Sequence, residues 1–510
     1  MTNPNDQKEE LFHFSITENL EENKKILEKA FRAEKNKDFI FRDIFVKEMK
    51  CEGLLIYING TIDNKTLEEF VIQPLLHMTT PNRKRNSLQH FCQQIITSTK
   101  STSISVFAEM NKHLLDGNVV LLMPGFAEAV SIRVAGFESR TIEKPENEAV
   151  VKGPKEAFVE SKHKNLTLIR KHLRDRSLVT ENMDLGKIET NEISFMYIDS
   201  IADPDLVREV KKRCSQIEAD AVEQLSILEQ HIEERPYSLV PSCMLTERPD
   251  RAAAFLREGH VIILDDQSPY ALITPITFWS LFHTSEDYYQ RWAYGNFIRI
   301  VRFLAVMIAL LTPSFYIAIS NYHAEMLPTD LLLAIAATRE VIPFPVVIEV
   351  LIMELAFELL REAGVRIPSV IGPTIGIVGA LILGQAAVEA NIVSPIMVLV
   401  VAITGLSSFA IPEVSFSFIV RILRFGFLLV AAVFGFFGMS LFMAAILAYL
   451  VSVQTFGVAF FSPLAPYSPS SKDFVVRPPI WKLWLRPLNL HPKQQSRKAD
   501  PEKGGYHEKT

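Results

Sequence analysis

Charge is distributed unevenly along this chain, and that limits what the chain can fold into. Of its 53 basic and 59 acidic side chains, only seven and nine fall within residues 299–466. Residues 1–298 carry a net charge of −9, and residues 467–510 carry +5. No lysine occurs between Lys212 and Lys472. A long stretch this poor in charge is typical of membrane segments, so we predict an integral membrane protein with a large polar N-terminal part and a short basic tail.

The same composition excludes a fibrous protein, a disordered chain and a plain soluble enzyme. The four cysteines are scattered without paired Cys/His spacing, so no metal site is predicted, and their sparse use fits a reducing compartment. Residues Met1–Phe14 are polar and lack the apolar core of a signal peptide. The polar N-terminal part is therefore expected in the cytosol.

Motifs of the common enzyme classes do not occur in the sequence. There is no G-x-x-x-x-G-K-[ST] phosphate loop, no H-E-x-x-H and no G-x-S-x-G. The glycines at 372, 376 and 379 lie in apolar sequence and not after a strand, so they do not indicate a dinucleotide site. We expect neither an enzymatic activity nor a cofactor.

Short apolar runs alternate with amphipathic helical stretches before residue 299, a pattern typical of an α/β fold. The runs are Gly53–Ile58, Asn118–Met123, Glu192–Ile198 and His260–Leu264. The predicted fold class is an α/β cytosolic region of two related subdomains, followed by an all-α polytopic membrane domain.

Two local matches indicate that the α/β region is an internal duplication. Tyr57–Asn59 matches Tyr197–Asp199 at an offset of 140 residues, and Gly117–Leu122 matches Gly259–Leu264 at an offset of 142. In both copies an Asp follows the first match and is a suitable helix N-cap. Two matches at nearly one offset favour two related subdomains.

The predicted organisation has six segments. They are a polar N-terminal segment (1–35), a first α/β subdomain (36–150), a basic linker or helix (151–188), a second α/β subdomain (189–295), a transmembrane domain of four to six crossings (296–457) and a basic cytosolic tail (458–510). The basic stretch Lys152–Arg176 is either a solvated helix and linker or a docking face for a neighbouring subunit or anionic lipid headgroups. It has no interleaved aromatic residues, so nucleic-acid binding is not expected.

Several apolar stretches after residue 299 are long enough to cross a bilayer, which takes ~20 residues. The expected spans are 300–319, 345–360, 371–388 and 394–411, with a longer block at 416–453 that is one long tilted helix or a short hairpin. A charged interlude at 325–340 contains a short interfacial or re-entrant helix. Arginine pairs beside the spans favour an even number of crossings, four or six, with the tail on the cytosolic side.

Carboxylates on the second expected span are the main candidates for an ion path. Glu349, Glu354 and Glu358 lie on this helix, and the last two share one face at i, i+4. Carboxylates in hydrocarbon are costly and face protein, water or a basic partner. Glu358 has Arg361 three residues on, so a helix-end ion pair is one interpretation. Glu354 has no basic neighbour on its own helix and is the better candidate for a hydrated path.

Small residues recur at every fourth position of the third expected span. They are Gly372, Gly376, Ala380 and Gly384. Such a stripe lets another backbone approach closely, which serves either packing alone or a pore or gate helix. Gln385 and Glu389 extend the polar character to the end of this span and complete the ion-path candidates.

Long motifs occur in one order along the chain. They are Glu148–Phe158, Ile201–Pro204, Thr246–Arg251, Ser285–Trp292, Met353–Arg366, Gly376–Gly379 and Gly384–Ala390. Through these motifs the chain resembles, from about Gly53 to Gly457, the A subunits of GerA-type spore germination receptors. Met123–Phe126 departs from the Asp-Gly-Tyr-like turn that relatives often have, which affects only a local loop.

The resemblance implies a multi-pass protein of the spore inner membrane with its N-terminal domain on the core side. It implies a permease-like B subunit, which senses the nutrient, and a lipoprotein C subunit as partners. It also implies a homo-oligomeric ring, a pentamer, that acts as a nutrient-gated cation channel in the membrane lipid. The residues themselves leave open a non-conducting scaffold subunit and a secondary transporter, although no inverted membrane repeat is found.

Overall fold

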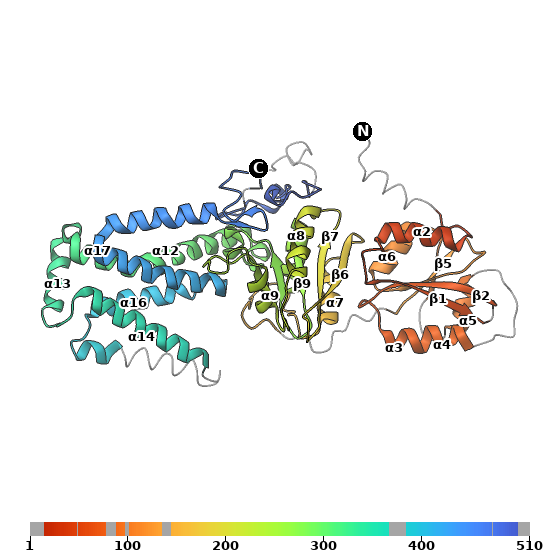
Figure 1. The fold of residues 1–510 in the computed structure, drawn as a ribbon, viewed down its shortest axis with the longest axis horizontal. Helices are drawn as coiled ribbons and strands as arrows, with labels where there is room; N and C mark the ends of the chain where they lie inside the picture. Colours follow the sequence, from red (N-terminus) through yellow and green to blue (C-terminus); the bar gives the residue numbers. More distant parts are fainter. Residues whose placement is uncertain are drawn as a thin grey trace.

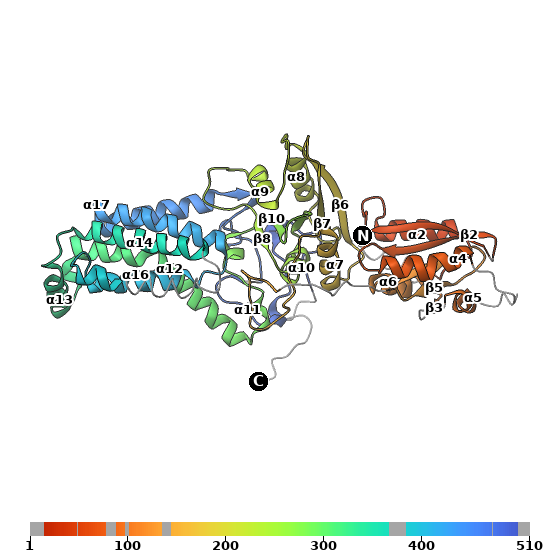
Figure 2. The ribbon, with the colours of Figure 1, turned by 90° about the horizontal axis from the view of Figure 1, so that it is seen from below.

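The computed structural model describes residues 15–47, 49–77, 88–96, 101–134, 144–366, 384–471 and 473–497. These residues form three bodies in a row (Figure 1 and Figure 2): a first α/β unit (residues 15–134), a second α/β unit (residues 144–285) and a bundle of long helices. The C-terminal segment (residues 462–471 and 473–497) returns from the bundle to the second α/β unit (Figure 1).

In the first α/β unit, the described residues form one antiparallel sheet with the strand order β1-β2-β4-β5-β3. Its strands are β1 (Phe39–Val46), β2 (Cys51–Ile58), β3 (Ser101–Ile104), β4 (Val119–Leu122) and β5 (Ala129–Ile132). The helices are α2 (Leu20–Phe31), α3 (Asn64–Leu67), a π-helical turn (Glu68–Ile72), α4 (Gln73–His77), α5 (Leu88–Ile95) and α6 (Phe107–Leu115). α2 and α6 cover one face and α3, α4 and α5 cover the other, so the central strands are apolar on both sides.

The second α/β unit repeats this arrangement, with the strand order β6-β7-β9-β10-β8. Its strands are β6 (Leu178–Leu185), β7 (Asn191–Ile198), β8 (Met244–Thr246), β9 (Val261–Leu264) and β10 (Ala271–Thr274). α7 (Lys162–His172) and α10 (Pro249–Glu258) pack on one face, and α8 (Pro204–Ser215) and α9 (Leu225–Ile232) pack on the other. The face covered by α7 and α10 continues without a break into the apolar core of the helix bundle.

The equivalence of the two units extends to their helix caps. Asp63 is the N-cap of α3 and accepts a hydrogen bond from the Lys65 amide. Asp203 is the N-cap of α8 and accepts one from the Asp205 amide. Equivalent strands and equivalent caps thus occur at the offsets seen in the sequence, whereas the antiparallel pairing could not be read from the alternation of elements.

Two elements lie outside the α/β segments expected from the sequence. β6 falls within residues 151–188, which the sequence indicates as a linker or helix, because polar side chains interrupt its apolar pattern. α2 falls within the polar segment 1–35, yet Leu27 and Phe31 are buried against the first sheet. The second sheet and the helical cover of the first sheet therefore begin earlier than expected, while the other predicted boundaries stay predictions.

Buried polar contacts join the two α/β units. Arg170 of α7 lies 2.7 Å from Asp38, which precedes β1, and both side chains are buried. The Thr167 hydroxyl donates to the Gly60 carbonyl at 2.6 Å, and the Asn36 amide donates to the Leu178 carbonyl at 3.3 Å. α7 of the basic stretch therefore lies between the units as a packed element and not as a free linker.

The helix bundle begins directly after a short helix, α11 (Glu286–Tyr289). Its helices are α12 (Trp292–Tyr322), α13 (Thr329–Arg339), α14 (Val346–Arg366), α16 (Pro395–Ser408) and α17 (Val414–Ser452). α12, α14, α16 and α17 lie side by side in both views (Figure 1 and Figure 2). In the described part of the chain, α12 and α17 are the two helices long and apolar enough to cross a membrane.

α17 is a hairpin and not one straight helix. Gly435 has φ 56° and ψ −143°, and the chain reverses there. The rings of Phe427 and Phe442 consequently lie 4.8 Å apart, whereas 15 residues of straight helix would separate them by about 22 Å. Residues with a Cβ rarely adopt this backbone conformation, and a Cβ here would also meet the Tyr322 ring at 3.1 Å. Of the two interpretations of this apolar block, the structure shows the hairpin.

Candidate functional site

The buried charges of the helix bundle meet between α14 and α17. Glu354 Oε2 lies 3.0 Å from Arg424 Nη2, and neither side chain is more than 1% exposed. Glu358, one turn further along α14, pairs with Arg421 and lies 3.8 Å from Arg424. The two glutamates lie at i, i+4 on one face of α14, and the two arginines lie at i, i+3 on the facing side of α17. The four side chains form one ion-pair cluster.

Within this cluster Arg421 donates a hydrogen bond to Glu358, whereas Glu354 and Arg424 form an ion pair without one. Among the described residues, neither carboxylate oxygen of Glu354 accepts a hydrogen bond, and Arg424 Nη2 donates none. Buried ion pairs offset the cost of leaving water best when every remaining donor and acceptor is also satisfied. The pair therefore neutralises two charges in the bundle without the full set of bonds that an optimised structural pair has.

Arg361 does not form the helix-end pair with Glu358 that the sequence allows. Among the described residues, the ion pairs of Glu358 are with Arg421 and Arg424 of α17. Arg361 instead donates a hydrogen bond to the Ser408 hydroxyl of α16, and its guanidinium lies 4.8 Å from the centre of the Phe409 ring. Arg361 thus ties α14 to α16.

Glu349 has a separate role at the start of α16. Its Oε1 accepts hydrogen bonds of 2.7 Å from both the amide and the hydroxyl of Ser394, the N-cap residue of that helix. A carboxylate beside a helix N-terminus satisfies free amides and complements the helix dipole. Glu349 is fully buried, so its carboxylate caps α16 and does not belong to the ion-pair cluster.

The other residues predicted for the site add no member to this cluster in the described part of the chain. Gly372, Gly376 and Ala380 lie outside the described residues. Gly384 is buried, and a Cβ added there would lie 3.4 Å from Val398 of α16, so it allows close packing. The Gln385 amide donates to Glu389 at 2.9 Å, and both side chains are exposed in the single chain.

Sequence reasoning missed the basic half of the cluster. Arg421 and Arg424 appear in the sequence as an arginine pair beside a span, which indicates orientation and not a pairing partner. Their spacing was the available signal, because it matches the one-face spacing of Glu354 and Glu358. The contact joins residues about 65 positions apart, and only the folded bundle brings them together.

Comparison with known proteins shows the family of the chain. The family model described as Bacillus/Clostridium GerA spore germination protein matches residues 25–489. The chain belongs to the GerA family. The resemblance predicted from its motifs is thereby confirmed.

Curated GerA-family relatives from Bacillus subtilis (strain 168) match most of both chains. Spore germination protein KA is 38% identical over 96% of this chain and 89% of the relative. Spore germination protein B1 is 35% identical, with coverage of 91% and 95%, and spore germination protein A1 is 36% identical, with coverage of 85% and 90%. All three relatives carry the name of spore germination proteins.

One solved structure is similar in the α/β region. The crystal structure of the N-terminal domain of the A subunit of the Bacillus megaterium spore germinant receptor GerK3 is 25% identical to this chain. The match covers 98% of that chain and 52% of this one, with a TM-score of 0.41.

Two further charged clusters lie where the second α/β unit, α11 and the bundle of this GerA-family chain meet. In one, Asp287 of α11 lies 3.0 Å from Arg299 and 3.1 Å from Arg302, both of α12. Burial acts to raise the pKa of Asp287, but Arg302 and Arg299 outweigh it and hold the pKa below its ordinary value. Asp473 of the C-terminal segment also pairs with Arg299, so three segments meet at one arginine.

The other cluster joins the start of α17 to α10. Arg251 of α10 lies 2.7 Å from Glu148 and 3.5 Å from Glu413, the N-cap residue of α17. All three side chains are at least largely buried. A displacement of α10 and α11 would therefore act directly on the first half of α12 and on the start of α17.

Proposed function

We propose that this chain is the A subunit of a nutrient-responsive spore germination receptor and that copies of it surround a ligand-gated cation path. Membership of the GerA family supports the receptor role. The partners proposed are a permease-like B subunit and a lipoprotein C subunit, and the ring proposed is a pentamer. The location proposed is the spore inner membrane, with the α/β units and the C-terminal segment on the cytosolic (core) side.

An even number of crossings is supported by the ends of the long helices. The first half of α12 contacts the end of the second α/β unit, where Arg302 donates to the Phe282 carbonyl, and the N-cap residue of α17 contacts Arg251 of α10. The last turn of α17 returns to the same unit, where the Tyr449 hydroxyl lies 2.7 Å from the Ser238 hydroxyl. Large apolar side chains such as Leu406 and Phe437, each 74% exposed, lie on the outside of the bundle, as lipid or a neighbouring subunit requires.

The single observation that carries the gating proposal is the buried pair of Glu354 and Arg424. Charges within a membrane domain mark ion pathways or partners that neutralise them. With Arg424 in place, the carboxylate of Glu354 is neutralised and a cation gains nothing by approaching it. A shift of α17 relative to α14 would separate the pair and expose Glu354 and Glu358 to a passing cation, which carboxylates select by charge. The cluster would then act as a latch with two arrangements: the ion pair is formed in the closed state and separated in the open state.

A scaffold role is the second candidate, and the same pairing favours it. If the cluster only holds α14 against α17, then the carboxylates are structural and no ions pass. The chain would then position the nutrient-sensing and lipoprotein subunits through its α/β units. A transporter would instead show saturable, coupled flux.

Reconstitution in liposomes distinguishes these functions. Ion flux would be measured for the wild-type chain, with and without its co-expressed partners, and for Glu354→Gln, Arg424→Gln and the exchanged pair Glu354→Arg/Arg424→Glu. Glu362→Gln is the matched control, because Glu362 is an exposed glutamate on the same helix.

For a latch, both single substitutions raise flux in the absence of nutrient, and the exchanged pair reduces that leak. If Glu354 acts only as a cation ligand, then Glu354→Gln lowers cation selectivity, and the exchanged pair Glu354→Arg/Arg424→Glu does not restore it. Absence of flux in every preparation, from protein shown to be folded and inserted, would reject the channel and leave the scaffold.

A further inference from the structure

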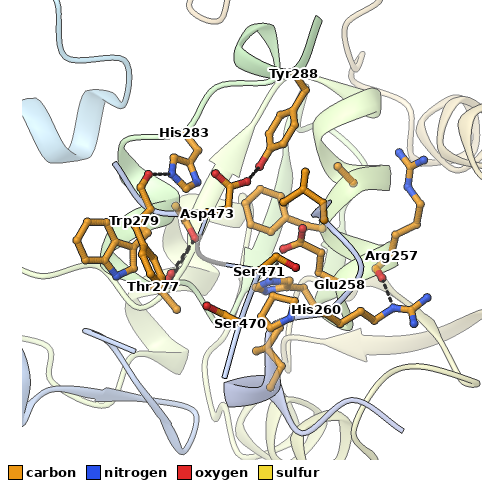
Figure 3. A pocket seen from close by; sticks show the side chains of 18 of the residues that line it. Arg257, Glu258, His260, Thr277, Trp279, His283, Tyr288, Ser470, Ser471 and Asp473 are labelled. Carbon is orange, nitrogen blue, oxygen red and sulfur yellow. Dashed lines mark hydrogen bonds and ion pairs between the residues drawn. The ribbon is translucent and has the colours of Figure 1, made fainter. Parts of the chain in front are cut away.

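A cavity of about 580 Å³ lies where the second α/β unit, the segment before the bundle and the C-terminal segment meet. Figure 3 shows side chains from all three around it, with Glu258, His260 and Trp279 in the α/β unit, Tyr288 in α11 before the bundle, and Ser471 in the C-terminal segment. Small-molecule sites typically enclose about 300–1,000 Å³ with mixed apolar and polar walls. The cavity has the size and the lining of such a site.

Most charges in its walls already have partners. The carboxylate of Asp250 pairs with Arg248 at 2.9 Å, and that of Asp473 pairs with Arg299. The carboxylate of Glu258 lies 2.5 Å from Arg497. His260 and His283 each hydrogen-bond a main-chain carbonyl, and burial lowers the pKa of both imidazoles, which favours the neutral form. The acidic side chains therefore leave little negative charge to attract a cation.

In the part of the chain that the structure describes, two arginines at the cavity lack a carboxylate partner. Among the described residues, neither Arg257 nor Arg486 forms an ion pair; Arg257 Nε donates to the Ala253 carbonyl at 3.1 Å. Arg486 Nε donates to the Arg257 carbonyl at 2.9 Å, and its Nη1 donates to the carbonyls of Gln494 and Ser496. Burial, followed by the charge of Arg497, lowers the pKa of Arg486, while the charges of Glu258 and Asp175 act to raise it.

Buried polar atoms in the lining add hydrogen-bonding capacity. In the described part of the chain, Trp279 Nε1, Ser462 Oγ and Asn489 Oδ1 have no hydrogen-bond partner. Trp279 is 8% exposed and Ser462 is 1% exposed. A buried polar group without a partner costs free energy, and the cavity walls supply both donors and an acceptor.

We propose that this cavity binds a small organic anion that carries a phosphate or carboxylate group, with this group against Arg257 and Arg486. Guanidinium groups bind such oxyanions through charge-assisted hydrogen bonds. The Trp279 and Tyr288 side of the cavity accommodates the organic part. The anion is either a free metabolite or the headgroup of an anionic lipid, because the cavity lies beside the first turns of the membrane-facing helix α12.

Such a ligand would act on the coupling between the α/β region and the bundle. One wall is the C-terminal segment, whose Asp473 pairs with Arg299 of α12, and another is α10. An occupant would hold these elements together, and this inference does not depend on the chain conducting ions.

The test uses the full chain in detergent and in lipid nanodiscs. Inorganic phosphate and glycerol phosphate are the soluble probes, and nanodiscs of phosphatidylcholine with or without phosphatidylglycerol supply the lipid arm. Amide hydrogen exchange in residues 483–490 and the midpoint of thermal unfolding are the readouts. The variants are Arg257→Gln and Arg486→Gln, and Arg208→Gln, an exposed arginine on α8, is the matched control.

A free anion would be the ligand if a soluble probe protects residues 483–490 and its apparent affinity falls at least about tenfold in both variants but not in the control. The same pattern seen only with phosphatidylglycerol would show a lipid headgroup. No protection from any probe, or protection that neither substitution weakens, would overturn the proposal. If Arg486→Gln unfolds the C-terminal segment, then Arg257→Gln, at an exposed side chain, decides the result.

Discussion

Glu354 of α14 and Arg424 of α17 form an ion pair of 3.0 Å inside the helix bundle, where both are almost completely shielded from solvent. Removing one partner of a buried pair leaves the other charge without compensation, which typically costs about 3–5 kcal/mol. We expect Glu354→Gln and Arg424→Gln each to lower the thermal stability of the purified chain strongly. The exchanged pair is expected to recover part of the loss, and Glu362→Gln to change little. Equal stability of the two single variants and the wild type would contradict a stabilising pair.

The turn of the α17 hairpin predicts a strong effect of a small substitution. Gly435→Ala places a Cβ in a backbone conformation that costs about 1–3 kcal/mol for other residues, and against the Tyr322 ring. We expect a lower unfolding temperature in detergent. Gly364→Ala in α14 is the control, because a Cβ there meets nothing within 4 Å and a helical Gly→Ala change stabilises by about 1 kcal/mol. A neutral Gly435→Ala would mean that the hairpin turn is elsewhere.

The contact between the α/β units is predicted to depend on Arg170. Its pair with Asp38 is buried, so we expect Arg170→Gln to cost about 3 kcal/mol and to make the connection between the units accessible to protease. The exposed pair of Arg42 and Glu68 gives the comparison, since surface pairs contribute about 0–1 kcal/mol. Limited proteolysis of Arg170→Gln and Arg42→Gln side by side measures the difference. Identical digestion patterns would contradict a rigid connection.

Stability of the second α/β unit is predicted to fall as pH rises. Burial, together with the charges of Glu233 and Glu413, raises the pKa of Glu229 to about 8. Between its ordinary pKa and this value the folded state holds a proton that the unfolded state releases, so each pH unit removes up to about 1.4 kcal/mol. Chemical denaturation at pH 5 and pH 8 measures this slope. Glu229→Gln should flatten it, whereas Glu223→Gln, at an exposed site before α9, should not.

The C-terminal segment is predicted to loosen near Asp473 when this residue is neutralised. Asp473 accepts a hydrogen bond of 2.6 Å from the Tyr288 hydroxyl and pairs with Arg299. Asp473→Asn keeps the shape of the side chain but removes the charge, so we expect faster hydrogen exchange in residues 473–497 and faster proteolysis there. Arg486 and Lys493 still bind main-chain carbonyls of the second α/β unit, so the exchange is expected to rise most near Asp473. If hydrogen exchange does not change, then the contacts of Arg486 and Lys493 are enough to hold the C-terminal segment in place.

Local patterns in the sequence predicted the repeated strands and helix caps, because each of these elements is determined by residues close to it in the chain. The matches at Tyr57 and Tyr197 lie in β2 and β7, equivalent strands of two sheets with one strand order. The N-caps Asp63 and Asp203 follow from the same local chemistry. β6 was missed because its outward positions are polar, and an edge strand shows a weak apolar pattern.

The sequence alone predicted the acidic residues of the ion-pair cluster but not the basic ones. Glu354 and Glu358 are unusual in apolar sequence and could be recognised without a structure. Their partners Arg421 and Arg424 depend on how α17 lies against α14, and no pattern within either helix reports that arrangement. The role of Glu349 as a cap on α16 was hidden for the same reason, since Ser394 is 45 residues away.

The reversal at Gly435 divides α17 into an arm of 21 residues (414–434) and an arm of 17 residues (436–452), and contacts at both ends fix these lengths. Both ends of the hairpin are anchored on the second α/β unit, at Glu413 through Arg251 and at Tyr449 through Ser238. Four extra residues in one arm alone would move one anchor by about 6 Å, since a helix rises 1.5 Å per residue. Insertions or deletions in this part of a GerA-family chain are therefore tolerable only in compensating pairs, one in each arm.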